Sequence, residues 1–408
     1  MTELLKKFFF STRLMSVLFI VFAIAMAFGT FIESWYSTDT ARIWIYNAIW
    51  FEAIMVFFVI NFIGNMFRYK LLRKEKWAVL TLHLSWILII VGAFVTRYIS
   101  YEGMMPIREG NTENVFFSDK TYLTVYVDGE IDSERKRKVL EDGILVTAQA
   151  LKSNLPWKSD FNGQPFTISY VDFIDGAKEG LIEDPNGKEY LKIVEAGDGN
   201  RHEHFLENGQ VANIHNVLFA LNKETPGAIN ITGNGDDFQI HTPYEGQYLR
   251  MADQMQGEVA QDSLQEFQMR SLYSMAGMQF VIPEPMVRGS YGVVPVPEEE
   301  KTANDLDALV LDVSSNGETV RKKLLGAKGM SSFSGSFFVG GLEFNMSYGS
   351  KVYTLPFGIK LNDFIAEKYP GTEKRYASFM SKVTVEDDRP FDYDIYMNHI
   401  LDYKGYRF

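Results

Sequence analysis

The sequence predicts an integral membrane protein: an α-helical N-terminal region with three transmembrane helices, followed by a large, mainly β extracytoplasmic domain. Two observations predict this class. Three long apolar runs fall within residues 1–97, each long enough to cross a hydrocarbon core of ~30 Å. The following 311 residues contain nine Asp-Gly or Asn-Gly pairs, which are the strongest short-range signal for β-hairpins. We therefore expect a membrane region over residues 1–97 and a β-rich region after it.

The three apolar runs have expected bounds of about 14–32, 43–67 and 77–96. The first carries no formal charge, and Glu52 is the only charged residue in the second. Basic residues and a small-residue segment make a cleaved signal peptide an alternative for the first run. We prefer a retained helix, because its apolar character continues to Ile32 and two more spans follow.

Basic residues set the expected orientation. The N-terminus and the loop between the second and third spans are rich in lysine and arginine, which is typical of cytoplasmic segments. The loop after the first span lacks this excess. We therefore expect the N-terminus in the cytoplasm and everything after the third span on the opposite side.

Charge and cysteine content exclude several functions. Residues 1–97 have a net charge of +5, whereas the rest of the chain has −17. An acidic exterior part argues against nucleic-acid binding and is compatible with a basic protein partner. The chain has no cysteine, which excludes disulfides, thiol exchange and covalent haem attachment to this chain.

Proline placement predicts the organisation of the exterior part. Four prolines fall between Pro283 and Pro297 and three glutamates follow, which indicates a Pro/Glu-rich linker over 283–300. We expect a first β-rich region over 98–282, with a helix near 263–279 where apolar residues fall at helical spacing. A second β-rich region is expected over 301–408, and we expect it to be truncated, because it ends without a stop signal or polar tail.

Two segments of the exterior part have similar sequences. Leu123–Val127 precedes a basic run at 135–138, and Leu309–Val313 precedes another at 321–323. A duplicated β unit and chance similarity between hairpins are equal alternatives.

His83 is the only histidine in the three apolar spans. It lies roughly 9 Å along the helix from Trp77, too deep for an interfacial group, and ionisable residues at such depth are functional candidates. A neutral imidazole can be an axial ligand of haem iron. Helix packing, or proton or quinone chemistry, are the alternatives. One imidazole fills one axial position, so a bis-histidine haem would need a second ligand from a partner or from a continuation of the chain; the alternative is that no haem binds.

Three charged residues near the outer membrane boundary are weaker candidates. Glu52 is either a buried acid that contacts a haem propionate or carries protons, or an interfacial residue. Arg97 and Arg108 follow the third span and are candidates for pairing with haem propionates, although an arginine at a membrane boundary needs no such role.

The remaining histidines lie in the exterior part. His202 and His204 would share one face of a strand, but no third ligand is evident, which favours a solvated loop over a metal site. We interpret His215, His241 and His399 as ordinary exterior histidines. No serine, cysteine or paired-carboxylate constellation predicts a hydrolase.

Several segments in a fixed order resemble the ResB (CcsB) family of system II cytochrome c biogenesis. They are the three-span opening with His83 early in the third span, Arg97-Tyr98, Glu102-Gly103, Ile107–Gly110, Gly358–Phe364 and Asn398–Phe408 with Tyr403-Lys404-Gly405. The resemblance is to the form in which this part is followed by a CcsA part. It covers nearly the whole chain, although no single motif in it is highly specific.

The resemblance implies a function in haem delivery. ResB-like proteins work with a CcsA-like membrane protein, fused or separate, to carry haem b across the bacterial inner membrane and present it to apocytochrome c in the periplasm. The family's haem-ligating histidine corresponds to His83. The chain is then a non-catalytic or co-catalytic subunit of a cytochrome c synthase complex, with a thioredoxin-like thiol reductant as a further partner and a fourth helix after Phe408. The alternative is a membrane-anchored β domain that binds or senses a ligand without haem.

Overall fold

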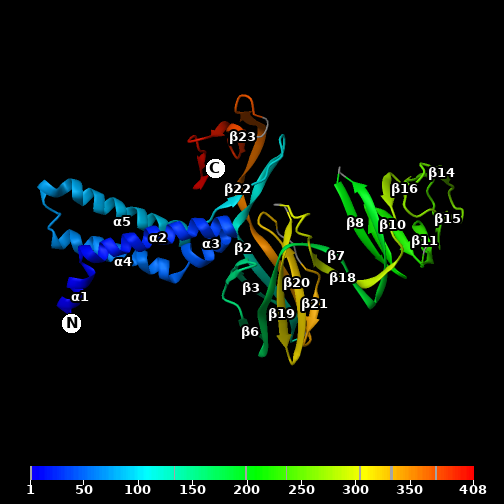
Figure 1. Cartoon of the computed structure of the whole chain (residues 1–408), viewed down its shortest axis with the longest axis horizontal. Coiled ribbons are helices and arrows are strands. Elements are labelled where there is room, and N and C mark those ends of the chain that lie inside the picture. Colours follow the sequence, from blue (N-terminus) through cyan, green and yellow to red (C-terminus); the bar gives the residue numbers. More distant parts are fainter. Residues whose placement is uncertain are drawn as a thin grey trace. The chain divides into compact units, whose positions relative to one another are not determined.

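Three long apolar helices form the N-terminal region of the computed structural model (Figure 1). They are α2 (Thr12–Trp35), α4 (Ile49–Arg68) and α5 (Trp77–Tyr98), and each has the length and apolar composition needed to cross a membrane. Short segments precede and connect them: α1 (Thr2–Phe9), α3 (Thr38–Ala41), the π-helical turn η1 (Arg42–Tyr46) and the 3-10 turn η2 (Lys74–Lys76). The predicted helical membrane region, followed by a mainly β part, is confirmed.

The second membrane helix begins later than predicted. We expected it over residues 43–67, but the backbone is extended at Ala48 (ψ 143°) and α4 begins at Ile49. The carbonyl groups of Tyr46 and Asn47 accept hydrogen bonds from the side chains of Arg97 and Lys152. These carbonyls are therefore used for tertiary contacts instead of a continuous helical ladder.

The structure describes residues 2–132, 134–197, 200–235, 237–302, 305–330, 334–372 and 375–408. The chain divides into two compact units. We call Met1–Gly176 with Asn304–Phe408 the membrane-linked unit, and Ala177–Ala303 the inserted unit. The predicted consecutive regions, 98–282 and 301–408, do not correspond to these units, because strands from both ends of the β-rich part pair with each other.

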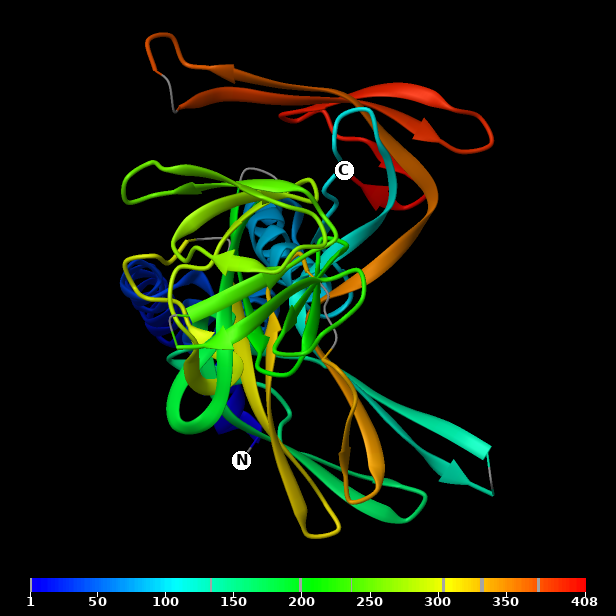
Figure 2. The same ribbon diagram turned by 90° about the vertical axis from the view of Figure 1, so that its right-hand side faces the viewer.

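Pairing between distant strands builds the main sheet of the membrane-linked unit. Its order is β1 (Gly103–Met104), β2 (Thr112–Ile131), β22 (Leu342–Lys368), β23 (Tyr376–Glu386) and β24 (Phe391–Tyr396). β3 (Glu134–Gly143) also pairs with β2, and β21 (Phe337–Val339) with β22. The register of β2 and β22 is antiparallel, with Leu123 opposite Tyr348. Figure 2 shows the long ribbon of β22 and β23 in orange.

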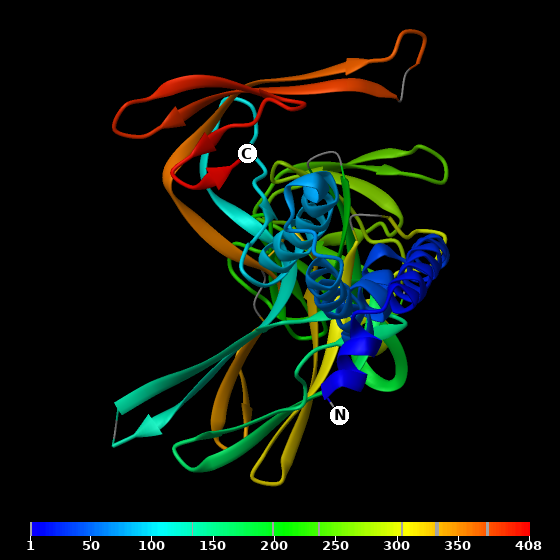
Figure 3. The same cartoon turned by 90° about the vertical axis from the view of Figure 1, so that its left-hand side faces the viewer.

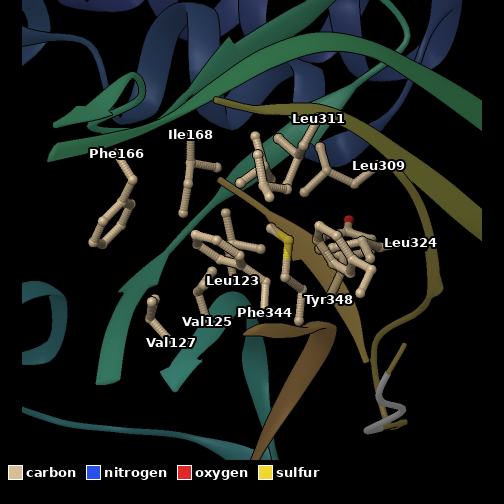
Figure 4. Close-up of a cluster of buried hydrophobic side chains, with 14 of the residues drawn as sticks. Leu123, Val125, Val127, Phe166, Ile168, Leu309, Leu311, Leu324, Phe344 and Tyr348 are labelled. Atoms are coloured by element: carbon tan, nitrogen blue, oxygen red, sulfur yellow. The ribbon is translucent and has the colours of Figure 1, made fainter. Parts of the chain in front are cut away.

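A second group of strands encloses the core of this unit. It contains β6 (Trp157–Phe161), the first part of β7 (Gln164–Gly197), β19 (Leu306–Ser315) and β20 (Glu318–Gly326). Side chains from β2, β7, β19, β20 and β22 meet in the core, including Leu123, Ile168, Leu311 and Phe344 (Figure 4). Alternation of buried and exposed residues along β2 and β22 gives each strand one apolar face for this core.

Smaller elements complete the membrane-linked unit. Two short hairpins are β4 (Leu145–Thr147) with β5 (Ala150–Lys152), and β25 (Asp402–Tyr403) with β26 (Tyr406–Arg407). A second apolar cluster joins the start of β2 to the later part of β22 and to β23, with Phe116, Phe357 and Val385 among its buried members. Figure 3 shows the membrane helices in blue beside strands of this unit.

The inserted unit also has a core between two groups of strands. One sheet has the order β15 (Gln265–Phe267), β12 (Asp237–His241), β11 (Ile229–Asn234), β10 (Val217–Leu221) and β9 (Val211–Ile214). The other group contains β14 (Gln256–Val259), β13 (Gly246–Arg250), β16 (Ser271–Met275), β17 (Met278–Val281), the later part of β7, β8 (Asn200–Glu207) and β18 (Val287–Pro295). Leu191, Phe219, Ile231 and Phe280 are fully buried between them.

The helix predicted near 263–279 is not formed. The segment contains β15, β16 and β17 instead, and Leu264 of the supposed apolar face is 61% exposed. Ser271, Tyr273 and Met275 are buried, which is the period of two of a strand. Ala276 and Gly277 both have positive φ (53° and 78°) and form the turn to β17.

The predicted Pro/Glu-rich linker over 283–300 contains strand β18, which pairs with β7. The four prolines do not interrupt its hydrogen-bonded core. Pro283 and Pro285 precede the strand, Pro295 is its last residue and Pro297 follows it. Proline is tolerated at strand ends, because the missing amide hydrogen is not needed there.

Candidate functional site

His83 lies on α5, and its hydrogen bond fixes which ring nitrogen is available for a ligand. Its Nδ1 is 2.9 Å from the carbonyl oxygen of Val79, one turn earlier in the helix. A carbonyl oxygen only accepts hydrogen bonds, so in the neutral ring Nδ1 carries the proton. Nε2 therefore presents its lone pair, as an axial metal ligand requires.

The neighbours of His83 leave its ring partly exposed. The Phe62 ring of α4 meets the imidazole edge to face, at 5.5 Å between ring centroids, and stacks on Trp86. The apolar gap between α2, α4 and α5 is lined by Phe19, Phe22, Met55, Phe58, Phe62, Trp86 and Ile90 and holds only about 30 Å³. A porphyrin cannot enter this gap.

The open side of α5 is extensive. No described residue of this helix is buried, whereas α2 and α4 each have buried residues. A Cβ atom added at Gly92 would meet nothing within 4 Å. Three helices alone therefore leave α5 without a packing partner along much of its length, and His83 lies on this helix.

Arg97 and Glu52 form an ion pair at the other end of α5. Arg97 also donates to the carbonyl oxygen of Tyr46 at 2.8 Å. Arg97 is 14 residues from His83, or roughly 21 Å along the helix, which is a large part of a ~30 Å hydrocarbon core. One haem at His83 cannot also use Arg97 and Glu52, so the structure separates these candidates into two places.

Arg97 and Glu52 belong to a polar group that we call the boundary cluster: Tyr46, Asn47, Glu52, Arg97, Lys120 and Lys152. Lys120 Nζ approaches the carbonyl oxygen of Arg97 at 3.5 Å, and Lys152 donates to that of Asn47. Burial lowers the pKa of Lys152, the positive charge of Arg97 lowers it further, and Glu52 acts in the opposite direction. Arg108, the third arginine candidate, is exposed in the loop before β2 and is not a member of this cluster.

Further polar contacts join the helices to the β-rich part of the same unit. Asp39 of α3 pairs with Lys328 at 2.8 Å, and Arg42 lies 3.6 Å from Asp119. Thr40, which is fully buried, donates to the hydroxyl of Thr147 at 3.1 Å. The boundary cluster and these contacts fix the membrane helices to strands of the membrane-linked unit.

The sequence analysis missed two buried asparagines in α4. Asn61 donates to the carbonyl oxygens of Phe9 and Ser11 at 2.6 and 3.0 Å, and Asn65 donates to Asn61 at 2.7 Å. They satisfy backbone groups where α1 meets α2. The sequence contains a signal for this contact: two asparagines, four residues apart, within an apolar run.

Histidines of the inserted unit form a cluster that the sequence analysis also missed. His202 and His204 lie on strand β8, not in a solvated loop. The sequence-predicted pair is not the group that forms: potential ligand atoms of His204, Glu195 and His215, without His202, all lie within 4.8 Å of one another. Glu195 belongs to β7 and His215 to the β9–β10 turn, so only the folded chain brings them together. His241 and His399 lie outside this cluster, and His399 stacks on Tyr393 and Tyr396.

The helices and the β-rich units define the class: a membrane protein with a helical N-terminal region and a large β part. Residues 326–408 match the ResB-like family, which confirms the resemblance for this segment, including Gly358–Phe364 and Asn398–Phe408. The chain is also 34% identical over 168 residues to protein NrfI of Wolinella succinogenes. That match covers 41% of this chain and 18% of NrfI, so the chain matches less than a fifth of the length of this relative.

Proposed function

We propose that this chain is a ResB-like component of cytochrome c biogenesis that binds haem in the bacterial inner membrane through His83. With a CcsA-like partner, it helps to export this haem to the periplasmic side and deliver it to apocytochrome c. Haem b is the cargo in this proposal. The chain contributes a ligand, a membrane surface and a periplasmic β part.

The position and protonation of the His83 ring carry the proposal. Its Nδ1 is engaged by Val79, which leaves the lone pair of Nε2 available, and the partly buried ring contacts Phe62 of α4. A partly exposed imidazole inside a membrane needs a polar or metal partner to offset its cost.

Much of α5 has no packing partner among the three helices. We therefore propose that a second membrane protein, or a further part of the same one, packs there and supplies the other axial ligand. The described part of the chain has one histidine in its membrane helices, and a bis-histidine haem needs two. A helix packed along α5 would cover its apolar face and bring a second ligand to the same haem. The ResB-like segment over 326–408 supports the assignment of this complex to cytochrome c biogenesis.

Haem content of the purified complex tests the proposal. The chain is produced with its CcsA-like partner, and the Soret absorbance per protein is measured for wild type and for His83→Gly. We expect His83→Gly to lose most of the haem, because the ligand is removed and the remaining cavity fits free imidazole. Adding imidazole to the buffer during purification should restore the absorbance.

Thr81→Ala is the matched control. Thr81 is exposed, lies two residues before the histidine in the same helix, and donates its hydroxyl hydrogen to the carbonyl of Trp77. This variant should keep the wild-type haem load. An equal load in His83→Gly and wild type would contradict haem ligation. The chain would then be better explained as a membrane-anchored β domain that binds a ligand without haem.

A further inference from the structure

The inserted unit contains a carboxylate in a row of core residues. On one face of β7, Leu191 and Ile193 are fully buried, and Glu195 continues the row at 3% exposure. The facing row on β8 is Leu206, His204 and His202, since Glu195 lies directly opposite His202 and Ile193 opposite His204. The apolar row of β7 thus ends in a carboxylate, and the facing row of β8 contains two imidazoles.

This carboxylate is poorly satisfied by the protein. Oε1 of Glu195 and Nε2 of His204 are both buried without a hydrogen-bond partner among the described residues. Nε2 of His215 lies 2.9 Å from Oε1, but the contact does not have the alignment of a hydrogen bond. A buried charge without aligned donors is costly unless a cation compensates it.

Both imidazoles direct the same nitrogen toward the same oxygen. Nε2 of His204 is 3.7 Å from Oε1 of Glu195, and Nε2 of His215 is 2.9 Å from the same oxygen. Two ligands of one tetrahedral zinc ion, each ~2.1 Å from the metal, lie ~3.4 Å apart. The two separations from Oε1 bracket this distance, and all three ligand atoms lie within 4.8 Å of one another, so side-chain rotations could bring them to one ion.

The backbone at His215 also points to a selected position. His215 and Asn216 form the two-residue turn between β9 and β10, with φ of 47° and 67°. Such turns favour asparagine and glycine, and other residues pay a conformational cost there. The His215 side chain is 55% exposed, so a metal ligand at this position would be accessible to solvent.

We propose that Glu195, His204 and His215 bind a divalent first-row metal ion, Zn²⁺ by preference. Two histidines and one glutamate are a common zinc ligand set. The ion would neutralise the buried carboxylate and tie β7, β8 and the β9–β10 turn together. Because His215 is exposed, at least one coordination position stays open to water or to an exogenous ligand.

Metal titration of the full-length protein tests this site. The protein is purified in detergent with an affinity tag that contains no histidine, then treated with EDTA and dialysed. Zn²⁺ binding is measured by competition with a zinc indicator, and Co²⁺ serves as a visible-absorption probe of coordination. We expect one ion per chain, and an affinity at least about 100-fold lower in His204→Gln, Glu195→Gln and His215→Asn, since even outer-shell changes cost ~10–100-fold.

His215→Asn is the sharpest variant, because asparagine is favoured at its turn position and the variant should fold normally. Without metal, its thermal midpoint should equal or exceed that of the wild type. Added Zn²⁺ should raise the midpoint of the wild type only. His241→Gln, a histidine of the same unit outside the cluster, should behave as wild type. Failure of the wild type to bind below millimolar Zn²⁺, or equal binding by His215→Asn, would overturn the proposal.

Discussion

Two arginine–aspartate pairs occupy equivalent positions in two hairpins of the membrane-linked unit. Asp128 of β2 accepts two hydrogen bonds of 2.7 Å from Arg137 of β3. Asp312 of β19 accepts bonds of 2.8 and 2.9 Å from Arg321 of β20. In each case the arginine lies nine residues after the aspartate and directly opposite it. The similar segments of the sequence therefore adopt the same hairpin geometry, whichever origin they have.

We predict that Asp128→Asn destabilises the protein more than Asp312→Asn. Asp128 is only 6% exposed, whereas Asp312 is 24% exposed and better screened by water. Loss of two charge-assisted hydrogen bonds at the buried site should cost about 2 kcal/mol. Thermal unfolding of the detergent-purified protein at pH 7 measures both variants. A larger loss for Asp312→Asn would show that burial does not decide the strength of these pairs.

The same aspartates give a prediction for pH. Hydrogen bonding from the arginine partner lowers the pKa of Asp128 and of Asp312. A pKa that is lower in the folded state contributes stability above the unfolded value, ~3.9 for aspartate, and that contribution is lost as the pH falls through the folded pKa. The stability difference between wild type and Asp128→Asn should therefore be constant from pH 7 to 5 and shrink below about pH 4. A difference that grows on acidification would contradict this sign.

Turn residues show how far local sequence predicts the β part. Asn162-Gly163 and Asn316-Gly317 both form two-residue turns with positive φ, as predicted for β-hairpins. Asp128-Gly129 and Asn186-Gly187 instead lie inside strands β2 and β7. The predicted turn at Asp198-Gly199 lies outside the described residues. Pairing of β2 with β22 is set by residues more than two hundred positions away, and no local signal contains it.

At the scale of elements, helix α4 holds the N-terminal helix through a close contact and polar bonds. A Cβ atom at Gly64 would lie 1.9 Å from the Phe10 ring, so only glycine fits there. Arg68 donates to the carbonyl oxygen of Phe10 at 2.8 Å, beside the bonds from Asn61. Small residues at helix contacts allow such close approach in membranes.

We predict that Gly64→Leu releases the segment around Phe10 from α4. Forcing a side chain into a filled contact costs about 1 to 3 kcal/mol. Trypsin cleavage at Lys7 and Arg13 should become faster in this variant, because both sites flank the displaced segment. Gly92→Leu is the control, since its Cβ would meet nothing within 4 Å. Equal cleavage rates in both variants would show that the Gly64 contact does not hold the segment.

Element type was predictable where composition was extreme. The three apolar helices follow from hydropathy alone, because their backbone groups have no alternative partners in a membrane. The helix expected near 263–279 was wrong, since four apolar residues near helical spacing also fit short strands joined by positive-φ turns. Proline positions in 283–300 marked the ends of β18 and not a linker.

At the scale of the whole molecule, the candidate sites depend on contacts between distant residues. His83 could be chosen as a candidate from the sequence, because one histidine in an apolar run is visible there. The cluster of Glu195, His204 and His215 was not, since nothing local shows that the β9–β10 turn returns to the end of β7. Likewise, Glu52 and Arg97 were separate candidates, and only the packing of α4 against α5 shows that they pair.

The Glu52–Arg97 pair anchors the point where the helices meet the β part of the membrane-linked unit. Both side chains are partly buried, at 32% and 26% exposure, and Arg97 also holds the carbonyl of Tyr46. We predict that Glu52→Gln and Arg97→Gln each destabilise the unit, because each leaves an unpaired charge near the membrane boundary.

A double-mutant cycle measures this pair. Combining Glu52→Gln with Arg97→Gln should cost less than the sum of the two single changes, with a coupling energy of about 1 kcal/mol or more, since neither charge is then left alone. Thermal unfolding in detergent measures the stability of the wild type, the two single variants and the double variant. Lys120→Gln is the control: it removes a weaker 3.5 Å contact in the same cluster and should destabilise the protein less than either single change. Strict additivity would mean that the two side chains act independently. Arg97 would then stabilise the unit mainly through its hydrogen bond to the Tyr46 carbonyl. The helices would be held to the strands by the contacts of Asp39, Thr40 and Lys152.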